Sequence, residues 1–383
     1  MRILLDPEIF HFGPCGMTRY YAALYQGLSE LGHKIDLPLR ISGSEYLNGH
    51  WETLHCRTRQ QTLPWRLLFK LSRTLDAKDY LQKVNASDYD LLLLSSPVQN
   101  TAFLKPLGGR PFAMVVHDTM RITVMPDGAV DTPGMIVERL SYLARRASMV
   151  ICISESTRSD LLQLSGMNPD RAVTIHTGQL LDSSPCSAPS MALPDKYVLF
   201  VGERSGRKNF RFLLQALAPL FHQDSDLHLI CTGTINEWES DWLNFLGISR
   251  QVISIPAPDP VLRYLYRHAL CLAHPTYYEG YGLPVLEAMA LGCPVVSANN
   301  SSIPEIGGDA VLYVNATDAD SILNSVAKLN ADPELRRRLS ETGVLQAAKF
   351  TREKMMKEIS RTLKDAIKDV NGLRPSAAMN DRM

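Results

Sequence analysis

The residues best suited to chemistry lie in the carboxyl-terminal half of the chain. Glu279 stands in a glycine-rich loop, and Glu287 follows it near the start of a helix whose first turn suits Pro284. A loop and a helix thus each present one carboxylate. Carboxylates accept hydrogen bonds from vicinal hydroxyls, so the pair suits a ligand with two sugar rings. Gly280 and Gly282 allow backbone amides to approach that ligand.

Three cations lie close together in a loop, Gly202–Asn209, that leads from a predicted strand into a predicted helix. Arg204, Arg207 and Lys208 fall within five residues, where guanidinium and ammonium groups can pair with phosphate oxygens. A solvated basic loop is the alternative. The pattern GxxxxGK[ST] cannot be fitted here, so this is not a P-loop.

A glycine-rich turn, Gly13–Tyr20, joins the first predicted strand to the first predicted helix. Glycine lets the backbone approach a ligand, and the helix-start amides near Gly16 favour an anion such as a diphosphate. A turn that needs glycine for its geometry alone is the alternative. The chain lacks GxGxxG, which argues against a dehydrogenase that binds a nicotinamide or flavin nucleotide.

These loops need a scaffold, and the hydrophobic pattern predicts one. Short apolar runs alternate with stretches such as Tyr20–Leu31 and Phe210–Phe221, where apolar residues return every three or four positions. Runs buried on both faces are typical of parallel strands, and their alternation with helices is typical of a doubly wound α/β sheet. The predicted strands are Ile3–Leu5, Leu91–Leu94, Ala113–Val116, Met149–Ile153, Tyr197–Val201, Leu227–Cys231, Val252–Ile255, Leu270–Ala273 and Pro294–Ser297.

The alternation of strands and helices occurs twice, on either side of a Ser- and Pro-rich stretch without periodicity. A chain of 383 residues also exceeds what one hydrophobic core usually serves. The predicted divisions are an amino-terminal domain over 1–180, a linker over 181–195, a second domain over 196–350, an amphipathic helix over 351–370 and a frayed tail over 371–383.

Composition excludes several classes of protein. Forty Lys and Arg balance 40 Asp and Glu, so no overall positive charge exists to attract nucleic acid. Seven dispersed cysteines form no CxxC pair, which favours a reduced, cytoplasmic chain. Asp6 and Glu8 interrupt the apolar stretch that a signal peptide needs, and no run is long enough to span a membrane.

The sequence at 279–296 resembles the retaining glycosyltransferases of family four, which have the GT-B fold. The family pattern E-G-[FY]-G-L-P-x-L-E-A-M-A-x-G-x-P-V-V is kept there at essentially every position. Gly16–Tyr20 is similar to the family's amino-terminal glycine loop, and Val115–Asp118 is similar to its histidine-bearing strand end. Ala147–Leu161 and the basic loop Val201–Asn209 extend the resemblance through nearly the whole chain.

The resemblance implies two Rossmann-like, doubly wound domains that face a cleft, with the carboxyl-terminal helix crossing back to the first domain. The first domain is then expected to bind the acceptor, and the second the nucleotide-sugar donor. Many members have arginine directly after the glycine of the basic loop, where this chain has Glu203. Arg204 is therefore displaced by one position, and its phosphate contact is less well supported than that of Lys208.

The resemblance also implies a role for each matching residue. Lys208 should contact the donor diphosphate, Glu287 the ribose, and Glu279 the transferred sugar. The Gly16 amide should face the phosphates, and His117 the donor sugar near the reacting centre. We take His117, Glu279 and Lys208 as the catalytic residues. The predicted donor-binding set is Gly16, Arg204, Arg207, Lys208, Glu279, Gly280, Tyr281, Gly282, Leu283 and Glu287.

No cofactor or metal is expected. Two Asp-x-Asp sequences, Asp88–Asp90 and Asp318–Asp320, invite a metal interpretation, but the first merely precedes a strand. GT-B enzymes generally stabilise the departing diphosphate with protein cations. The motifs contain no evident enzymic nucleophile, which favours front-face displacement, in which the leaving phosphate takes the acceptor proton.

We therefore predict a retaining hexosyltransferase that acts on a glycan or lipid-linked oligosaccharide acceptor in cell-surface polysaccharide biosynthesis. The G-M-T-R-Y and R-K-N sequences resemble those of bacterial O-antigen and exopolysaccharide mannosyltransferases, so GDP-mannose is the predicted donor. A UDP-sugar is the alternative, because the motifs identify neither the base nor the sugar. A non-catalytic sugar-nucleotide scaffold, a GT-B phosphorylase and a sugar-nucleotide epimerase are the remaining alternatives.

The segment His55–Tyr80 has six cations against two acidic residues in an otherwise neutral chain. Arg66, Lys70 and Arg73 fall at helical spacing on one face. An amphipathic helix packed on its own core is one interpretation. The other is a helix at an anionic membrane surface, which predicts peripheral attachment of the protein to the cytoplasmic leaflet. The apolar area expected for this contact comes from Trp65, Leu68, Phe69 and Leu75.

Overall fold

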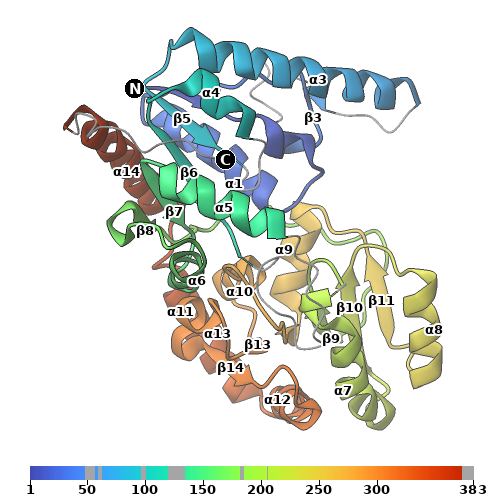
Figure 1. Ribbon diagram of the computed structural model, residues 1–383. Helices are drawn as coiled ribbons and strands as arrows, with labels where there is room; N and C mark the ends of the chain where they lie inside the picture. Colours follow the sequence, from blue (N-terminus) through green and yellow to red (C-terminus); the bar gives the residue numbers. More distant parts are fainter. Residues whose placement is uncertain are drawn as a thin grey trace. The chain divides into compact units, whose positions relative to one another are not determined.

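The computed structural model describes residues 1–47, 57–58, 63–95, 101–119, 134–181, 185–204 and 206–372. These residues form two compact units. Those before Thr177, together with those from Glu353 onward, make up the first unit, and Thr177–Arg352 makes up the second. Each unit is built on its own six-stranded parallel sheet (Figure 1), so the predicted α/β fold class is confirmed.

The sheet of the first unit has the strand order β2-β1-β5-β6-β7-β8. Every neighbouring pair is parallel, and the apolar runs of the central strands are buried on both faces. A separate parallel pair consists of β3 (Ile41–Ser42) and β4 (Arg57–Thr58). The strands of the main sheet are β1 (Arg2–Leu5), β2 (Lys34–Asp36), β5 (Leu91–Leu94), β6 (Phe112–Val116), β7 (Met149–Cys152) and β8 (Ala172–Thr174).

Helix α6 shows how residues of the sequence cap a helix of the first unit at both ends. At the start of α6, Ser154 Oγ accepts a hydrogen bond from the Thr157 backbone N–H at 3.0 Å, and Gly166 ends the helix with φ of 60°. The short 3-10 helices are η1 (Glu8–His11), η2 (Glu45–Leu47), η3 (Thr101–Phe103) and η4 (Pro169–Arg171). The α-helices are α1 (Gly16–Glu30), α3 (Leu63–Ala86), α4 (Leu104–Leu107), α5 (Gly134–Arg146), α6 (Glu155–Ser165) and α14 (Arg352–Gly372).

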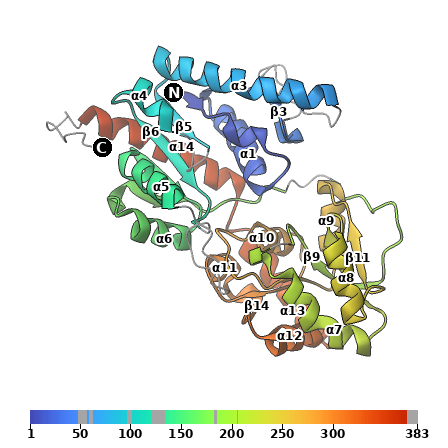
Figure 2. The same cartoon turned by 45° about the vertical axis from the view of Figure 1, so that its right-hand side comes forward.

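Helix α14 packs on the first unit, as the predicted return of this helix requires. Ser360 Oγ lies 2.7 Å from His33 Nε2, and Met356 packs so closely on Gly27 of α1 that an added Cβ would lie 2.5 Å from Met356 Cγ. Figures 1 and 2 both show α14, in red, among the blue and green elements of this unit. Its buried face consists of Met355, Met356, Ile359, Leu363 and Ala366.

The second unit repeats the architecture, with the strand order β11-β10-β9-β12-β13-β14. Its strands, all parallel, are β9 (Lys196–Phe200), β10 (Leu227–Thr232), β11 (Val252–Ile255), β12 (Cys271–His274), β13 (Val295–Ala298) and β14 (Val311–Val314). Its helices are α7 (Phe210–Gln223), α8 (Glu237–Leu246), α9 (Asp259–His268), α10 (Leu283–Ala290), α11 (Ile303–Gly307), α12 (Ala319–Ala331) and α13 (Pro333–Ala347). Residues 185–194 of the predicted linker have no regular secondary structure. From residue 373 on, the predicted tail is outside the described residues.

All nine predicted strands are present, each within one residue at either end. The sequence reasoning missed the separate pair β3 and β4, and also β2, β8 and β14, which are edge strands of the two main sheets. These edge strands are only partly buried, and β2 and β8 are three residues long. An edge strand packs against fewer neighbours, so its sequence need not form the apolar run that marks a central strand.

In each sheet the strand order reverses at one point. In the first sheet, β2 lies on one side of β1 and β5 lies on the other. In the second sheet, β10 and β12 lie on either side of β9 in the same way. Loops after the two strands diverge at such a point and leave a crevice at the carboxyl ends, where ligands of doubly wound sheets bind. We call these places the β1–β5 and β9–β12 switch points.

Candidate active site

Glu279 is the centre of a buried ion cluster at the β9–β12 switch point. It follows β12, while Arg207 and Lys208 lie in η5 (Gly206–Lys208), which follows β9. Glu279 Oε1 lies 2.5 Å from Lys208 Nζ and 3.0 Å from His274 Nε2. Arg207 Nη1 donates to Glu279 Oε2 at 3.1 Å. The fold thus brings three predicted site residues together, with Glu279 5% and Lys208 9% exposed.

The two loops that carry the cluster are tied to each other. Thr276 Oγ1 donates a hydrogen bond to the Arg207 carbonyl at 2.9 Å. Asn209 Nδ2 donates to the carbonyls of Pro275, at 2.9 Å, and Ala316, at 2.8 Å. Asn209 has φ of 61°, a left-handed conformation that asparagine tolerates better than most residues. This conformation ends η5 and starts α7 directly after Lys208.

Two serines before α11 hold the backbone of Glu279. The Glu279 N–H donates to Ser301 Oγ at 2.9 Å, and Ser302 Oγ donates to the Glu279 carbonyl at 2.9 Å. The carboxylate is held by three side chains and its backbone by two more. The geometry of the cluster therefore exists before any ligand binds, which is the condition for pre-organised electrostatic stabilisation.

The charges of the cluster leave it positive. Burial opposes ionisation of Glu279, but Lys208, the hydrogen bond from His274 and then Arg207 hold the pKa of the carboxyl well below its ordinary value. Burial and then the Lys208 charge lower the pKa of His274, so its Nε2 donates to Glu279 as a neutral imidazole. Two cations and one carboxylate give a net charge of +1 at neutral pH. A buried site with this charge favours an anion.

The glycine loop after β12 leads directly into α10. Gly282 precedes the helix with φ of 101°, and a Cβ there would lie 2.7 Å from Ile303 Cδ1, so the position requires glycine. Tyr281 is buried, and its hydroxyl donates a hydrogen bond to the Thr177 carbonyl. The predicted residues of this loop therefore follow one another at the carboxyl end of β12: Glu279, Gly280, Tyr281, Gly282 and Leu283.

Glu287, the second predicted carboxylate, lies in the middle of α10 and is 4% exposed. Its Oε2 accepts a hydrogen bond from the hydroxyl of Tyr266, on α9, at 3.1 Å. Glu279 thus contacts cations, whereas Glu287 contacts a neutral hydroxyl. The two predicted carboxylates therefore have different partners within the same unit.

Arg204 lies apart from the Lys208 cluster, although the two residues are close in sequence. Its guanidinium donates to both carboxylate oxygens of Glu239, at 2.7 and 3.0 Å, and to the carbonyls of Thr232 and Thr234. These partners line a cavity of about 390 Å³ at the carboxyl ends of β9 and β10. The structure therefore gives Arg204 a bidentate structural partner and no contact with Glu279.

His117 and Gly16, the predicted site residues of the first unit, lie after β6 and at the start of α1. The His117 ring centroid is 4.8 Å from that of Tyr20 and 5.5 Å from that of Tyr21. Burial lowers the pKa of His117 to about 4, so the imidazole is neutral at neutral pH. Its buried Nε2 has no hydrogen-bond partner among the residues that the structure describes. Gly16 is exposed.

Helix α3 exposes the predicted basic residues but not all of the expected apolar ones. Arg66, Lys70 and Arg73 are exposed, whereas Trp65 is half-buried. The expectation for Phe69 was wrong, because it is 6% exposed and its ring lies against His11. Leu68 and Leu75 are exposed as expected, and Leu67 and Leu71, which were not expected to contribute, are exposed as well. Within the described part of the chain, no helix has both the length and the apolar character needed to cross a bilayer.

The two Asp-x-Asp sequences have structural partners. Asp88 pairs with the Arg2 guanidinium, and Asp90 accepts a hydrogen bond from the Arg2 backbone N–H at 2.7 Å. Asp318 caps α12 by accepting from the backbone N–H groups of Asp320 and Ser321. Across the described residues, no three His, Cys, Asp or Glu side chains are grouped as metal ligands.

Two family models match the chain. One is described as "Glycosyltransferase Family 4" and matches residues 14–179, and the other is described as "Glycosyl transferases group 1" and matches residues 189–346. The chain belongs to glycosyltransferase family four. The first model includes Gly16 and His117, and the second includes Lys208 and Glu279.

This family 4 glycosyltransferase is similar to curated proteins from several bacteria. The O-antigen chain mannosyltransferase B of Escherichia coli is 32% identical over 229 residues, which are 54% of this chain and 58% of that protein. A D-inositol 3-phosphate glycosyltransferase of Corynebacterium glutamicum (strain R) is 27% identical over 264 residues, or 63% of each protein. The matched stretches therefore span less than two thirds of these two relatives.

Solved structures share the fold of this glycosyltransferase. HepE from Anabaena, solved in complex with UDP and glucose, has a TM-score of 0.71 and 19% identity, over 95% of this chain and 100% of that one. A sucrose-phosphate synthase from Thermosynechococcus elongatus has a TM-score of 0.73 and 19% identity, over 96% of this chain and 100% of that one. At this identity the likeness concerns the fold alone, which is the predicted GT-B fold.

Several residues of the site were missed by sequence reasoning. The position of His274, five residues before Glu279 at the end of a strand, is a signal that could have found it. Asn209 also stands in the basic loop, directly after Lys208. No signal of spacing marks the residues that come from other elements, which are Tyr266, Ser301, Ser302 and Ala316.

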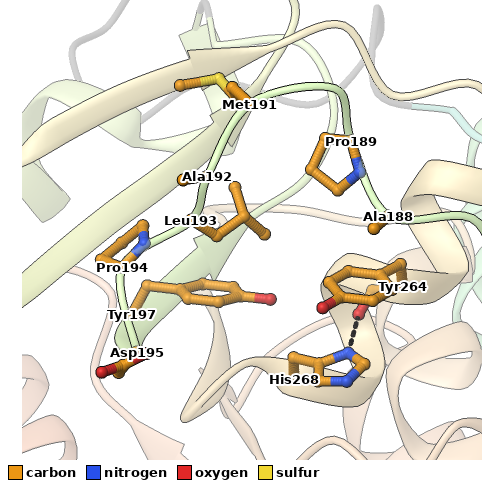
Figure 3. Close-up of a pocket in the computed structure, with 10 residues that line it drawn as sticks. All are labelled: Ala188, Pro189, Met191, Ala192, Leu193, Pro194, Asp195, Tyr197, Tyr264 and His268. Atoms are coloured by element: carbon orange, nitrogen blue, oxygen red, sulfur yellow. Dashed lines mark hydrogen bonds between the residues drawn. The ribbon is translucent and has the colours of Figure 1, made fainter.

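Another cavity of this glycosyltransferase, of about 340 Å³, lies in the second unit between residues 188–195 and α9. Figure 3 shows the rings of Tyr197 and Tyr264 facing its interior from opposite sides, and His268 stacks on Tyr264 with centroids 3.9 Å apart. Tyr197 is near the amino end of β9, whereas Lys208 follows the carboxyl end of this strand. The cavity therefore lies at the opposite end of the strands from Lys208. None of the predicted site residues lines it.

Proposed function

We propose that this protein is a retaining glycosyltransferase that moves a sugar from a nucleotide-sugar donor to a hydroxyl of a glycan or lipid-linked oligosaccharide. The observation that carries the proposal is the buried cluster of Glu279, Lys208, Arg207 and His274 at the β9–β12 switch point. Family membership supports the reaction class. On this proposal, the second unit binds the donor and the first unit binds the acceptor.

The donor diphosphate binds at Lys208 and Arg207. Lys208 donates one hydrogen bond to Glu279 and has two further N–H groups for phosphate oxygens. The net charge of +1 stabilises the negative charge that grows on the leaving diphosphate. Protein cations thus supply the charge that a metal supplies elsewhere, and we propose that none is needed. A chelator such as EDTA should leave the transfer rate unchanged.

Glu279 and Glu287 bind hydroxyls of the donor. Glu279 Oε1 accepts two hydrogen bonds and Oε2 accepts one, so Oε2 can accept one more, from the transferred sugar. Glu287, beside the Tyr266 hydroxyl, is assigned to the ribose. Both carboxylates are assigned to ligand binding rather than to nucleophilic attack, because Glu279 is held by two cations and Glu287 accepts a hydrogen bond from Tyr266. This supports front-face displacement, with the leaving phosphate accepting the acceptor proton.

The proposed donor is GDP-mannose. The mannosyltransferase among the relatives supports mannose, whereas the HepE neighbour was solved with UDP and glucose, which keeps a UDP-sugar as the second candidate. Thermal shifts with GDP-, UDP- and dTDP-sugars distinguish the two. GDP-mannose is expected to give the largest stabilisation, because a ligand that binds only the folded state raises its stability. If UDP-sugars alone stabilise the protein, GDP-mannose is not the donor and a UDP-sugar takes its place in the proposal.

Release of nucleoside diphosphate in the presence of acceptor tests catalysis itself. Lys208→Ala should lower turnover about a hundredfold, because one pre-organised charge contact to the leaving group is worth about 3 kcal/mol. Lys328→Ala, an equal charge change at an exposed position of α12, is the matched control and should turn over like the wild type. Wild-type turnover in a folded Lys208→Ala protein contradicts the assignment. Donor binding without any turnover would indicate the non-catalytic scaffold.

We further propose that α3 attaches the enzyme peripherally to the inner face of the cytoplasmic membrane. Leu67, Leu71 and Leu75 recur every four residues and are 66%, 57% and 38% exposed, so they form an apolar stripe along the helix. Exposed cations flank the stripe. An apolar stripe with flanking cations is the pattern of a helix that lies in a membrane interface with anionic lipids.

A further inference from the structure

The first unit contains a cavity of about 520 Å³ at the β1–β5 switch point. One wall is the loop after β1, with Asp6 and Glu8, and another is η3, which lies beyond β5. The third wall is one face of α3, where four residues recur at helical spacing: Lys70, Arg73, Thr74 and Ala77. The cavity therefore occupies the place where a doubly wound sheet binds its ligand.

The cations of the cavity are unpaired, whereas the acidic residues of α3 are not. Asp76 accepts hydrogen bonds from His11 and from Arg40, at 3.0 and 2.8 Å, and Arg40 also pairs with Asp79. Lys70 and Arg73 are exposed and form no ion pair with any residue that the structure describes. Two positive charges thus remain available on the cavity wall.

The wall formed by the loop after β1 carries carboxyl groups. Asp6 is buried and accepts hydrogen bonds from the Ser95 hydroxyl at 2.6 Å and from the Ser95 backbone N–H at 3.1 Å. Glu8 is half-buried. Burial and then the nearby Asp6 charge raise the pKa of its carboxyl, and the Arg73 charge opposes this only in part. Carboxyl groups on one side bind sugar hydroxyls, and cations on the other bind a phosphate.

We infer that this cavity binds the acceptor as a phosphorylated sugar, with the hydroxyls toward Glu8 and the phosphate toward Lys70 and Arg73. The inference rests on the proposed function, which requires an acceptor in this unit. The ligand chemistry has two sources, a soluble sugar phosphate or a sugar linked to lipid through a diphosphate. The stripe of Leu67, Leu71 and Leu75 on the same helix offers apolar surface for a lipid chain.

Calorimetric titration of the full chain with mannose 1-phosphate tests the cavity, with mannose as the uncharged probe. The wild type should bind the phosphate at least about tenfold more tightly, because charge-assisted hydrogen bonds are roughly twice as strong as neutral ones. The double variant Lys70→Ala with Arg73→Ala should lose that preference. Lys78→Ala with Lys105→Ala removes the same charge from exposed positions outside the cavity and should retain it.

Three results would overturn the inference: no preference for the phosphate, a preference that survives without Lys70 and Arg73, or an equal loss in both double variants. Lys208→Ala must retain the preference, since a loss there would place the probe in the donor site. Nucleoside diphosphate release, measured on the same proteins, tests the proposed function separately. Transfer without a phosphate preference contradicts the cavity alone, and a phosphate preference without transfer contradicts the proposed function alone.

A farnesyl diphosphate-linked mannose distinguishes the two sources. If the lipid-linked sugar is the ligand, this probe should bind more tightly than mannose 1-phosphate, and Leu67→Ser with Leu71→Ser should remove only the additional affinity. Equal affinities of the two probes assign the cavity to a soluble sugar phosphate. Both results support the cavity, because each depends on Lys70 and Arg73. If the farnesyl probe binds the variant without Lys70 and Arg73 as tightly as the wild type, the inference is contradicted.

Discussion

The two switch points differ in whether their charged side chains are paired with each other. At the β9–β12 switch point, Glu279, Lys208 and His274 are buried and bonded to one another. At the β1–β5 switch point, Lys70 and Arg73 are exposed on the wall of an open cavity and form no ion pair with the described residues. The β9–β12 switch point therefore pairs its cations with a buried carboxylate, whereas the cavity at the β1–β5 switch point presents Lys70 and Arg73 to solvent.

This difference has energetic consequences. Removing one member of a buried ion network leaves its partners desolvated and unpaired, which costs about 3–5 kcal/mol, whereas an exposed pair is worth less than about 1 kcal/mol. A pre-formed network suits a ligand group of constant geometry, such as the proposed donor diphosphate. Removing a charge from the Glu279 cluster should therefore have a larger effect than removing Lys70 or Arg73.

The largest effect is expected from Glu279→Gln. The amide keeps the shape but leaves Lys208 and Arg207 without their carboxylate, so the free energy of unfolding should fall by about 3 kcal/mol. Turnover should fall on the order of a hundredfold. Denaturant titration measures the first quantity, and nucleoside diphosphate release measures the second.

Glu237→Gln is the control for Glu279→Gln, because Glu237 is an exposed residue of α8 in the same unit. It should change unfolding and turnover less than Glu279→Gln does. If the two variants unfold at the same denaturant concentration, the network does not contribute to stability as the comparison requires.

A half-buried histidine of the first unit sharpens the comparison. Because burial lowers the pKa of His117 to about 4, below its ordinary value of 6.5, the folded state excludes a proton that the unfolded state binds. Stability should therefore fall as the pH falls from 6.5 to 4, by about 3 kcal/mol from this residue alone. His117→Phe removes that contribution and should flatten the pH dependence of unfolding. An unchanged slope in the variant contradicts the burial of the ring.

Asn209 tests how firmly the two loops of the network are joined. Asn209→Ala loses the hydrogen bonds to Pro275 and Ala316 and places alanine at φ of 61°. The free energy of unfolding should fall by about 2–3 kcal/mol. Asn209→Gly loses the same bonds without the strain, so it should be about 1 kcal/mol more stable than the alanine variant. Equal denaturation midpoints for the two would show that the left-handed backbone has no cost there.

The sequence predicts the network only in part. Lys208 and Glu279 could be expected to meet, because their loops follow strands that neighbour each other in the sheet. Spacing alone could not show that Arg204 lies apart from Lys208, because the Arg204 side chain is held by Glu239, a partner on α8. Tyr266 is likewise visible only once the strand order brings α9 beside α10.

The same limit applies to the fold. Strands buried on both faces, such as Leu91–Leu94, are apolar throughout and could be predicted within a residue. The edge strand Lys34–Asp36 has two charged residues and pairs on one side only, so its sequence does not distinguish it from a loop. On α3, helical spacing predicted the exposed cations, but whether Phe69 or Leu71 faces solvent depends on packing against η1.

The smallest effect is expected from a single exposed charge of the first unit. Arg66 lies beside the leucine stripe of α3 but does not line the cavity. One cation near an anionic bilayer is worth about 1 kcal/mol, so Arg66→Ala should weaken co-sedimentation with phosphatidylserine vesicles about fivefold at low salt, and less as salt screens the attraction. Lys328→Ala, in the second unit, should co-sediment like the wild type. Equal binding to neutral and anionic vesicles, or equal loss in both variants, would show that α3 does not make the membrane contact.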